Sequence, residues 1–321
     1  MNLQTKIPLE KTPKKLIDYK SNVLLLGSCF SENIGKKLTY YKFKNVQNPF
    51  GILFHPKAIE ALISDAVKDK EYSESDVFYH NEQWHCFNAH SKLSHSYKED
   101  LLIDLNKNVR LTHKQIKEST HIIITIGTAW VYRFVETGKV VANCHKVPQK
   151  QFNKTLLSVD AICESLNNIT DLVRKVNDKV SIIFTVSPVR HLKDGFIENT
   201  KSKAHLITAI HRYLNQETSI VDGELFYFPS YEIMMDELRD YRFYKEDMIH
   251  PNQTAINYIW EAFKNVWILE SVSKTMEDIN TIQKGLKHKP FNPKSQAHQK
   301  FLQNLQDKIK NIELQFPNIV F

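Results

Sequence analysis

Ser28 is the residue of this sequence whose surroundings most favour nucleophilic chemistry. It follows a short, mostly apolar run at residues 22–26 and Gly27, and it precedes a stretch with helical spacing at residues 28–38. Such a run is typical of a strand buried on both faces of a parallel sheet. A serine between this strand and a helix lies where open α/β sheets bind ligands, and helix N–H groups there can stabilise an oxyanion. The alternative is that Ser28 only caps the helix.

Asp247 and His250 form a second group with chemical potential, near the end of the predicted core. Three residues apart on one turn, the carboxylate can contact imidazole Nδ1 and leave Nε2 free as a general base. A serine hydroxyl needs such a base because it is a weak nucleophile at neutral pH. Each group alone is common in proteins. Together, with the serine first and the Asp-His pair last, they predict a Ser-His-Asp hydrolase.

The elements that must position these residues alternate along the chain. Strands are predicted at residues 121–126, 180–186 and 226–228, and helices at residues 97–117, 156–177 and 253–267. Strands that alternate with helices indicate βαβ units and a parallel, doubly wound sheet. The last helix starts just after Pro251, a residue suited to a helix N-terminus.

Two stretches interrupt this alternation, and a basic tail follows it. Residues 77–86 and 129–142 are predicted to form β-hairpins inserted beside the sheet, the second turning at Thr137-Gly138. From about Ser271 the chain becomes polar and basic and ends in a helical segment. We therefore expect a hydrolase domain over residues 1–272 and a basic, helical C-terminal appendage over residues 273–321.

Several separated segments resemble the GSCFA family, a branch of the SGNH (GDSL-like) hydrolase superfamily. They are Leu25-Leu26-Gly27-Ser28-Cys29-Phe30-Ser31-Glu32-Asn33, Asn48-Pro49-Phe50-Gly51, Gly127-Thr128-Ala129-Trp130, Asn143-Cys144-His145-Lys146, Ser187-Pro188-Val189-Arg190-His191 and Tyr241-Arg242-Phe243-Tyr244. The resemblance covers about residues 1–270 and implies a three-layer α/β/α, flavodoxin-like fold. It also implies an esterase that cleaves an acyl ester, often an acetyl ester. The superfamily places its serine in a G-D-S block, whereas here Gly27 precedes Ser28 and Cys29 follows it.

The resemblance also implies an oxyanion hole with three donors: the serine N–H, a glycine N–H and an asparagine side chain. Gly51 is the candidate glycine because it follows a Pro-Phe turn, and Gly127 is a second candidate for the oxyanion hole. The block at Gly127 lacks the expected asparagine, so both Asn48 and Asn143 are candidates for the amide. The alternative for each is a turn residue without a catalytic role.

Side chains near these blocks are expected to line a substrate pocket. The candidates are Trp84, His90, Ser91, Thr128, His145, Arg190 and His191. Arg190 could bind an anionic substrate group or orient a carboxylate, and the alternative is an ion pair with an acid such as Asp194. Cys29 is a poor nucleophile candidate because neighbouring side chains on a helix point about 100° apart. The histidines and cysteine of residues 80–95 match no zinc motif, so we expect no metal and no cofactor.

Composition narrows the class of protein. With 321 residues, 42% of them apolar, the chain is long enough for one large α/β core. Because it shows neither a secretory signal nor an apolar run of about 20 residues, we expect a soluble, cytoplasmic protein. Its four scattered cysteines fit free thiols. The net charge of +7 is spread along the chain without a nucleic-acid module, so we expect neither nucleic acid nor membrane partners.

The expected partner is therefore a small-molecule or carbohydrate acyl ester, and the oligomeric state, including a homo-oligomer, stays open. Two other functions also remain open. An acyltransferase would pass the acyl group to a sugar hydroxyl instead of water, and a binding module would use the same fold without catalysis.

Overall fold

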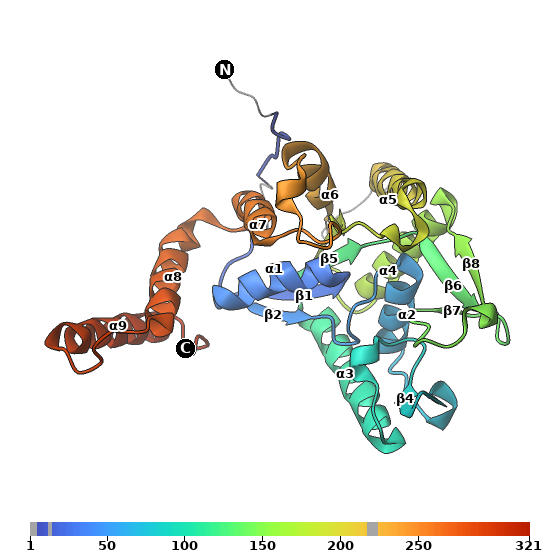
Figure 1. Ribbon diagram of the computed structural model, residues 1–321, viewed down its shortest axis with the longest axis horizontal. Coiled ribbons are helices and arrows are strands. Elements are labelled where there is room, and N and C mark those ends of the chain that lie inside the picture. The colour runs from blue at the N-terminus through green and yellow to red at the C-terminus, as the bar shows by residue number, and fades with distance from the viewer. Residues whose placement is uncertain (1–4, 12–14, 217–223) are drawn as a thin grey trace.

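Five parallel strands form the central sheet, in the order β2-β1-β5-β9-β10 (Figure 1). The computed structural model describes residues 5–11, 15–216 and 224–321. The strands are β1 (Asn22–Gly27), β2 (Lys44–Gln47), β5 (His121–Ile126), β9 (Ser181–Val186) and β10 (Leu225–Tyr227). Numbered within the sheet, this order is 2-1-3-4-5, which is the doubly wound, flavodoxin-like arrangement. The predicted fold class is confirmed.

Helices cover both faces of the sheet and make the three layers. One face carries α1 (Cys29–Tyr40) and α7 (Gln253–Trp267); the other carries α2 (Pro56–Val67), α3 (Lys98–Glu118), α4 (Val159–Arg174) and α5 (Phe196–Gln216). Alternate residues of a strand point to opposite faces. In β1, Leu24 and Leu26 accordingly belong to the α2–α5 core, and Val23 and Leu25 to the α1–α7 core.

Two small antiparallel sheets lie beside the central one. The first pairs β3 (Phe78–His80) with β4 (Gln83–His85), and the second has β6 (Trp130–Phe134) between β7 (Val140–Val141) and β8 (Phe152–Leu156). Both predicted hairpins are confirmed. The helix predicted from residue 156 is wrong at its start, because residues 152–156 pair with β6 and α4 begins only after its N-cap, Ser158.

The C-terminal tail forms two helices, α8 (Ser273–Lys287) and α9 (Gln296–Gln315), which extend away from the sheet in Figure 1. Buried side chains of both helices, such as Ile279 and Ile309, nevertheless belong to the apolar cluster of the α1–α7 face. The Tyr40 hydroxyl also donates to Asn280 Oδ1 at 2.9 Å. The buried side chains of the tail thus continue this apolar cluster. The division at residue 272 into domain and appendage stays a prediction.

None of the helices in the described part of the chain combines the length and the apolar character that a membrane crossing requires.

Candidate active site

Ser28 stands at the carboxyl end of β1, between two features that fix its backbone. Gly27 has a φ of 126°, and a Cβ at this position would overlap the carbonyl oxygen of Thr125, so only glycine lets β1 approach β5 so closely. The Ser28 N–H donates to Thr125 O at 3.0 Å. Its Oγ caps α1 by accepting the Phe30 N–H at 3.2 Å. Ser28 is therefore both the helix cap and a hydroxyl held at the ligand-binding edge of the sheet.

Asp247 and His250 are joined directly on one turn. His250 Nδ1 donates to Asp247 Oδ2 at 2.7 Å, while Asp247 Oδ1 accepts the N–H groups of Ile249 and His250, both at 2.9 Å. These bonds, the His250 N–H first among them, lower the pKa of Asp247 to about 2. The carboxylate is thus ionised at neutral pH and sets the Nδ1–H tautomer of the imidazole. His250 Nε2 is left available as a proton acceptor.

Asp247 and His250, called the dyad below, are not hydrogen-bonded to Ser28 among the residues the structure describes. Ser28 Oγ accepts the Phe30 N–H, and His250 bonds to Asp247. His191 lies near His250. Its Nε2 lies against Gly127 at the carboxyl edge of β5, and burial, Lys203 and the nearby His250 lower its pKa to about 3. Catalytic hydrogen bonds often tighten only when substrate binds.

The backbone donors expected for an oxyanion hole are already engaged. The Ser28 N–H bonds to Thr125 O, the Gly51 N–H to Asn48 O at 2.8 Å, and the Gly127 N–H to Phe54 O at 2.7 Å. The Gly51 N–H closes a turn, and the Gly127 N–H joins the end of β5 to the residue Phe54, so neither is a free N–H group. The expectation that either glycine supplies an oxyanion donor is therefore not supported in this arrangement.

Asn48 differs from the two glycines because it keeps a free donor. Its Oδ1 accepts the N–H of Gly27 at 2.9 Å, so the amide lies next to the strand end that carries Ser28. Its Nδ2 is buried without a hydrogen-bond partner. A buried unpaired donor is costly, which makes this group a candidate for binding substrate. Asn143, the other candidate, uses its Oδ1 to accept the His145 N–H at 2.8 Å and lines a separate cavity.

That cavity, of about 460 Å³, opens beyond the carboxyl edge of β5. Three predicted pocket residues line it, Thr128, His145 and His191, together with Asn143, a candidate for the oxyanion amide. It also contains aromatic side chains that the sequence did not single out, among them Trp130 and Tyr132 of the β6–β8 sheet. In the sequence, Trp130 and Tyr132 are two positions apart on one strand. This spacing shows only that their side chains lie on the same face of that strand.

The other predicted pocket residues lie in different places. His90 packs on Gly51, where an added Cβ would come within 2.4 Å of His90 Cβ, and its Nδ1 accepts the Lys92 N–H. Ser91 Oγ bonds to His145 Nδ1 at 3.3 Å. The ring of Trp84 instead packs at a tilt against that of Tyr79. Trp84 lines neither this cavity nor a second cavity, of about 270 Å³, beside Arg190, so its expected role as a pocket wall is not supported.

Within the described part of the chain, Arg190 bonds to the turn of residues 247–250 (the dyad turn) and to no acidic side chain. Asp194, the alternative partner, pairs with Lys154. Arg190 Nη1 donates to Met248 O at 3.2 Å, and its backbone N–H donates to Ile249 O at 3.2 Å. The idea that it orients a carboxylate directly is therefore not supported among the described residues.

Cys29 is partly buried, and His85 and His95 are hydrogen-bonded within the fold. Burial, followed by the charge of Glu32, raises the pKa of the Cys29 thiol, which opposes thiolate formation. His85 bonds to Ser94 and to a carbonyl, and His95 bonds to Asp104. Across residues 5–11, 15–216 and 224–321, three or more His, Cys, Asp or Glu side chains nowhere come together as a metal site.

Lys203 is a site residue that the sequence did not indicate. It lies on α5 and is 1% exposed, and its Nζ donates to Gly127 O at 2.8 Å and to Ser187 O at 2.7 Å. Burial lowers its pKa to about 7. Through these two bonds Lys203 links the residues that directly follow β5 and β9, close to His191. A lysine on a helix is ordinarily exposed, so no sequence pattern marks this one.

Two buried histidines at the cavity predict a pH-dependent stability. His55 Nδ1 accepts the Ala58 N–H and caps α2, and His145 Nε2 bonds to Cys86 O at 2.7 Å. Burial lowers the pKa of each to about 4. An unfolded histidine has a pKa of about 6.5, so between pH 6.5 and 4 the unfolded chain binds more protons. Stability from these groups is complete above pH 6.5 and is lost as the pH falls toward 4.

We expect the free energy of unfolding to fall by about 1–3 kcal/mol per histidine across this window. Denaturant titrations at pH 7.0 and 5.0 measure it. His55→Asn keeps a capping acceptor but cannot be protonated, so it should reduce the difference between the two pH values. An unchanged pH dependence in both His55→Asn and His145→Gln would contradict the assignment.

Solved structures with low similarity to this chain include two esterases. A carbohydrate esterase family 3 structure from Talaromyces cellulolyticus has 10% identity and a TM-score of 0.38, and covers 80% of this chain and 99% of its own. An acetyl esterase mutant, solved with an acetate ion, has 11% identity and a TM-score of 0.37, and covers 81% of this chain and 99% of its own. Likeness at this level adds no argument about activity. No curated protein matches the sequence.

Family profiles match most of the chain. The profile of the GSCFA family covers residues 22–263, which include Ser28, Asn48, Asp247 and His250. A second profile, described as the C-terminal domain of GSCFA domain proteins, covers residues 279–321, which contain α9 and most of α8. The chain belongs to the GSCFA family.

Proposed function

We propose that this protein is a serine esterase of the SGNH type that cleaves an acyl ester, with acetyl as the first candidate acyl group. The observation that carries the proposal is the Asp247–His250 pair, in which an ionised carboxylate bonds Nδ1 and leaves Nε2 free. Ser28 supplies the nucleophile at the start of α1. The family membership and the fold are compatible with this reading.

In the proposed reaction, Ser28 Oγ attacks the ester carbonyl and transfers its proton to His250 Nε2. The imidazolium then gives this proton to the departing alcohol as the carbon–oxygen bond breaks, which leaves an acyl-enzyme. A water molecule attacks the acyl group, again with His250 as base, and releases the acid and Ser28. Asp247 stabilises the imidazolium in both halves and stays ionised throughout.

The negative oxygen formed in each half needs hydrogen-bond donors. We propose that Asn48 Nδ2 is one of them, because it is buried, unpartnered and linked through Oδ1 to Gly27. Asn48 has a φ of 42°, a left-handed conformation that asparagine tolerates better than most residues. A donor held by its own backbone bonds requires little reorganisation during the reaction.

Replacing Asn48 with aspartate should lower kcat by about 10²–10³-fold with little change in KM. Aspartate keeps an oxygen for the Gly27 N–H but has no N–H to offer to an oxyanion. The matched control is Asn143→Asp, since Asn143 also uses Oδ1 to accept a backbone N–H. Steady-state kinetics on one ester compare the two. Equal losses in both variants, or none in Asn48→Asp, would remove Asn48 from the oxyanion hole.

The function itself is tested with the purified 321-residue protein and a panel of acyl esters. The panel contains aryl esters of short and medium acyl chains, acetylated monosaccharides and acetylated glycans, and Ser28→Ala serves as the blank. We expect release of acid from at least one acetyl ester above this blank. Adding a sugar acceptor separates transfer from hydrolysis, because transfer yields an acylated sugar in place of free acid. No turnover and no labelling by a fluorophosphonate would reject the proposal.

A further inference from the structure

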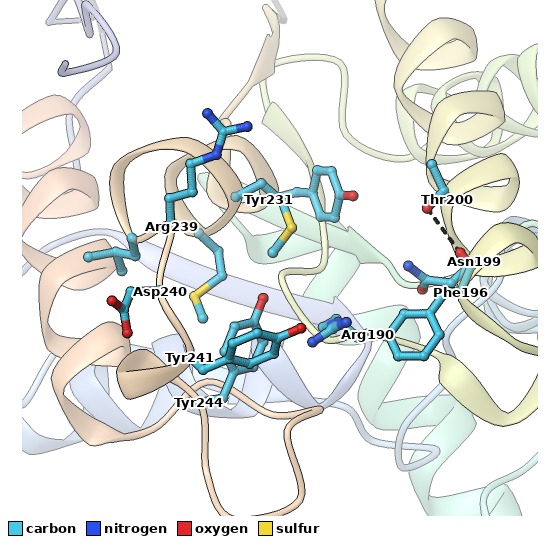
Figure 2. Close-up of a pocket in the computed structure, with 12 residues that line it drawn as sticks. Arg190, Phe196, Asn199, Thr200, Tyr231, Arg239, Asp240, Tyr241 and Tyr244 are labelled. Carbon is cyan, nitrogen blue, oxygen red and sulfur yellow. Dashed lines mark hydrogen bonds between the residues drawn. The ribbon is translucent and has the colours of Figure 1, made fainter. Parts of the chain in front are cut away.

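Arg190 joins the turn that carries the dyad to a neighbouring cavity of about 270 Å³ (Figure 2). Its backbone N–H donates to Ile249 O and its guanidinium Nη1 donates to Met248 O, both at 3.2 Å. These carbonyls belong to the two residues between Asp247 and His250. One residue, which follows β9 in the sequence, therefore holds the middle of the dyad turn from outside that turn.

The dyad turn needs such support because burial does not hold it. The side chains of Asp247 and His250 are 44% and 42% exposed. Met248 has a φ of 55°, a left-handed conformation that is uncommon for a residue other than glycine, asparagine or aspartate. Such a conformation persists where surrounding contacts determine it. The Arg190 bond to the carbonyl of Met248 is one of these contacts.

Aromatic rings fix the Arg190 side chain in turn. Its guanidinium carbon lies 5.1 Å from the ring centre of Phe196, 5.2 Å from that of Tyr244 and 5.7 Å from that of Tyr241. Figure 2 shows Phe196 on one side of the guanidinium and the two tyrosine rings on the other. Phe196 begins α5, whereas the tyrosines precede the dyad, so Arg190 connects two parts of the fold. Stacking of this kind suits arginine and not lysine.

We propose that Arg190 is a positioning residue for His250: it holds the dyad turn so that Nε2 is presented toward Ser28. This inference rests on the proposed esterase function. It differs from the expectation that Arg190 binds an anionic substrate. A misplacement of a catalytic group by about 1 Å costs on the order of 10²-fold in rate, so the loss of Arg190 should reduce kcat and leave substrate binding nearly unchanged.

The test compares Arg190→Ala with Arg239→Ala. Arg239 lines the same cavity, but its guanidinium points away from Arg190 in Figure 2, which makes it a matched control for charge and volume. We expect Arg190→Ala to lower kcat and the rate of fluorophosphonate labelling by about 10–100-fold, with KM within about twofold. The loss should be the same for a neutral and an anionic ester. Added guanidinium ion should restore part of kcat in Arg190→Ala only.

Three outcomes would overturn the inference: unchanged kcat in Arg190→Ala, a raised KM confined to anionic esters, or equal losses in both variants. If Arg190→Ala does not fold, Arg190→Lys replaces it. Lysine keeps the charge but not the planar group, so it should show the same loss in kcat, and an activity equal to wild type would count against the proposal. A wild-type protein that is neither labelled nor active rejects the esterase function instead.

Discussion

Ser28→Ala is expected to remove essentially all ester hydrolysis and all covalent labelling by a fluorophosphonate. The loss should reach about 10⁴-fold or more in kcat, because removing one member of a triad costs nearly as much as removing the whole unit. The structural reason is the position of Oγ, between the carboxyl end of β1 and the first turn of α1. Mass spectrometry of the labelled protein measures the first effect and steady-state kinetics the second.

Stability measurements separate the nucleophile from the helix cap. Ser28 Oγ accepts the Phe30 N–H, so Ser28→Ala should also lower the free energy of unfolding by about 1 kcal/mol. Ser28→Asp keeps a capping oxygen at the N-terminus of a helix, where a carboxylate is favourable. We expect it to retain more stability than Ser28→Ala and to be equally inactive. If Ser28 only caps the helix and is not the nucleophile, Ser28→Asp should instead have an activity close to that of the wild type.

Cys29→Ala is the control for the neighbouring thiol. Burial and Glu32 raise the pKa of Cys29, so the thiol is protonated at neutral pH and should take no part in labelling. Cys29→Ala is expected to be labelled at a rate near that of wild type. Labelling that survives Ser28→Ala and disappears in Cys29→Ala would assign the nucleophile to the cysteine.

The sequence predicted the parts of the fold and site that depend on local patterns. The all-buried strands β5 and β9 were visible as continuous apolar runs, because both of their faces are covered by helices. The Asp247–His250 contact was predictable from spacing alone, since three residues on one turn bring the two side chains together. Strand β8 was missed because five residues that alternate between buried and exposed are too few to distinguish from a helix start.

The sequence could not predict which backbone N–H groups are free to bind an oxyanion, because this depends mostly on partners far away in the sequence. The N–H of Gly127 is occupied by Phe54 O, 73 positions earlier, and that of Ser28 by Thr125 O. The Gly51 N–H is the exception, because its partner, the carbonyl oxygen of Asn48, is only three positions earlier. Arg190 shows the same limit: an ion pair with the nearby Asp194 was one alternative, whereas its hydrogen bonds go to backbone carbonyls of another loop. Contacts between loops follow from the fold and leave no periodic signal.

His250→Ala and Asp247→Asn are expected to have the second-largest effects, by different routes. His250→Ala removes the proton acceptor, so kcat/KM should fall by about 10³-fold or more. Asp247→Asn can keep an oxygen for the N–H groups of Ile249 and His250, so the turn should persist. Its amide, however, would offer an N–H to His250 Nδ1. This favours the tautomer with the proton on Nε2, which cannot accept the proton of Ser28. The same kind of substitution in a Ser-His-Asp protease lowers kcat by about 10⁴-fold.

The pH profile of kcat/KM distinguishes these roles from a general loss of structure. Wild-type kcat/KM should fall as the pH is lowered, because a protonated imidazole cannot accept the proton of Ser28. The carboxyl of Asp247 cannot cause this fall, since its pKa lies at about 2. Asp240→Asn is the matched control: Asp240 also accepts a backbone N–H in the same loop, that of Arg242, but it bonds no histidine. We expect Asp240→Asn to retain the wild-type rate and profile. If His250→Ala kept near-normal kcat/KM with the same acid limb, the base would have to be another histidine, and His145 and His191, whose rings bond no carboxylate in the described part of the chain, would be tested next.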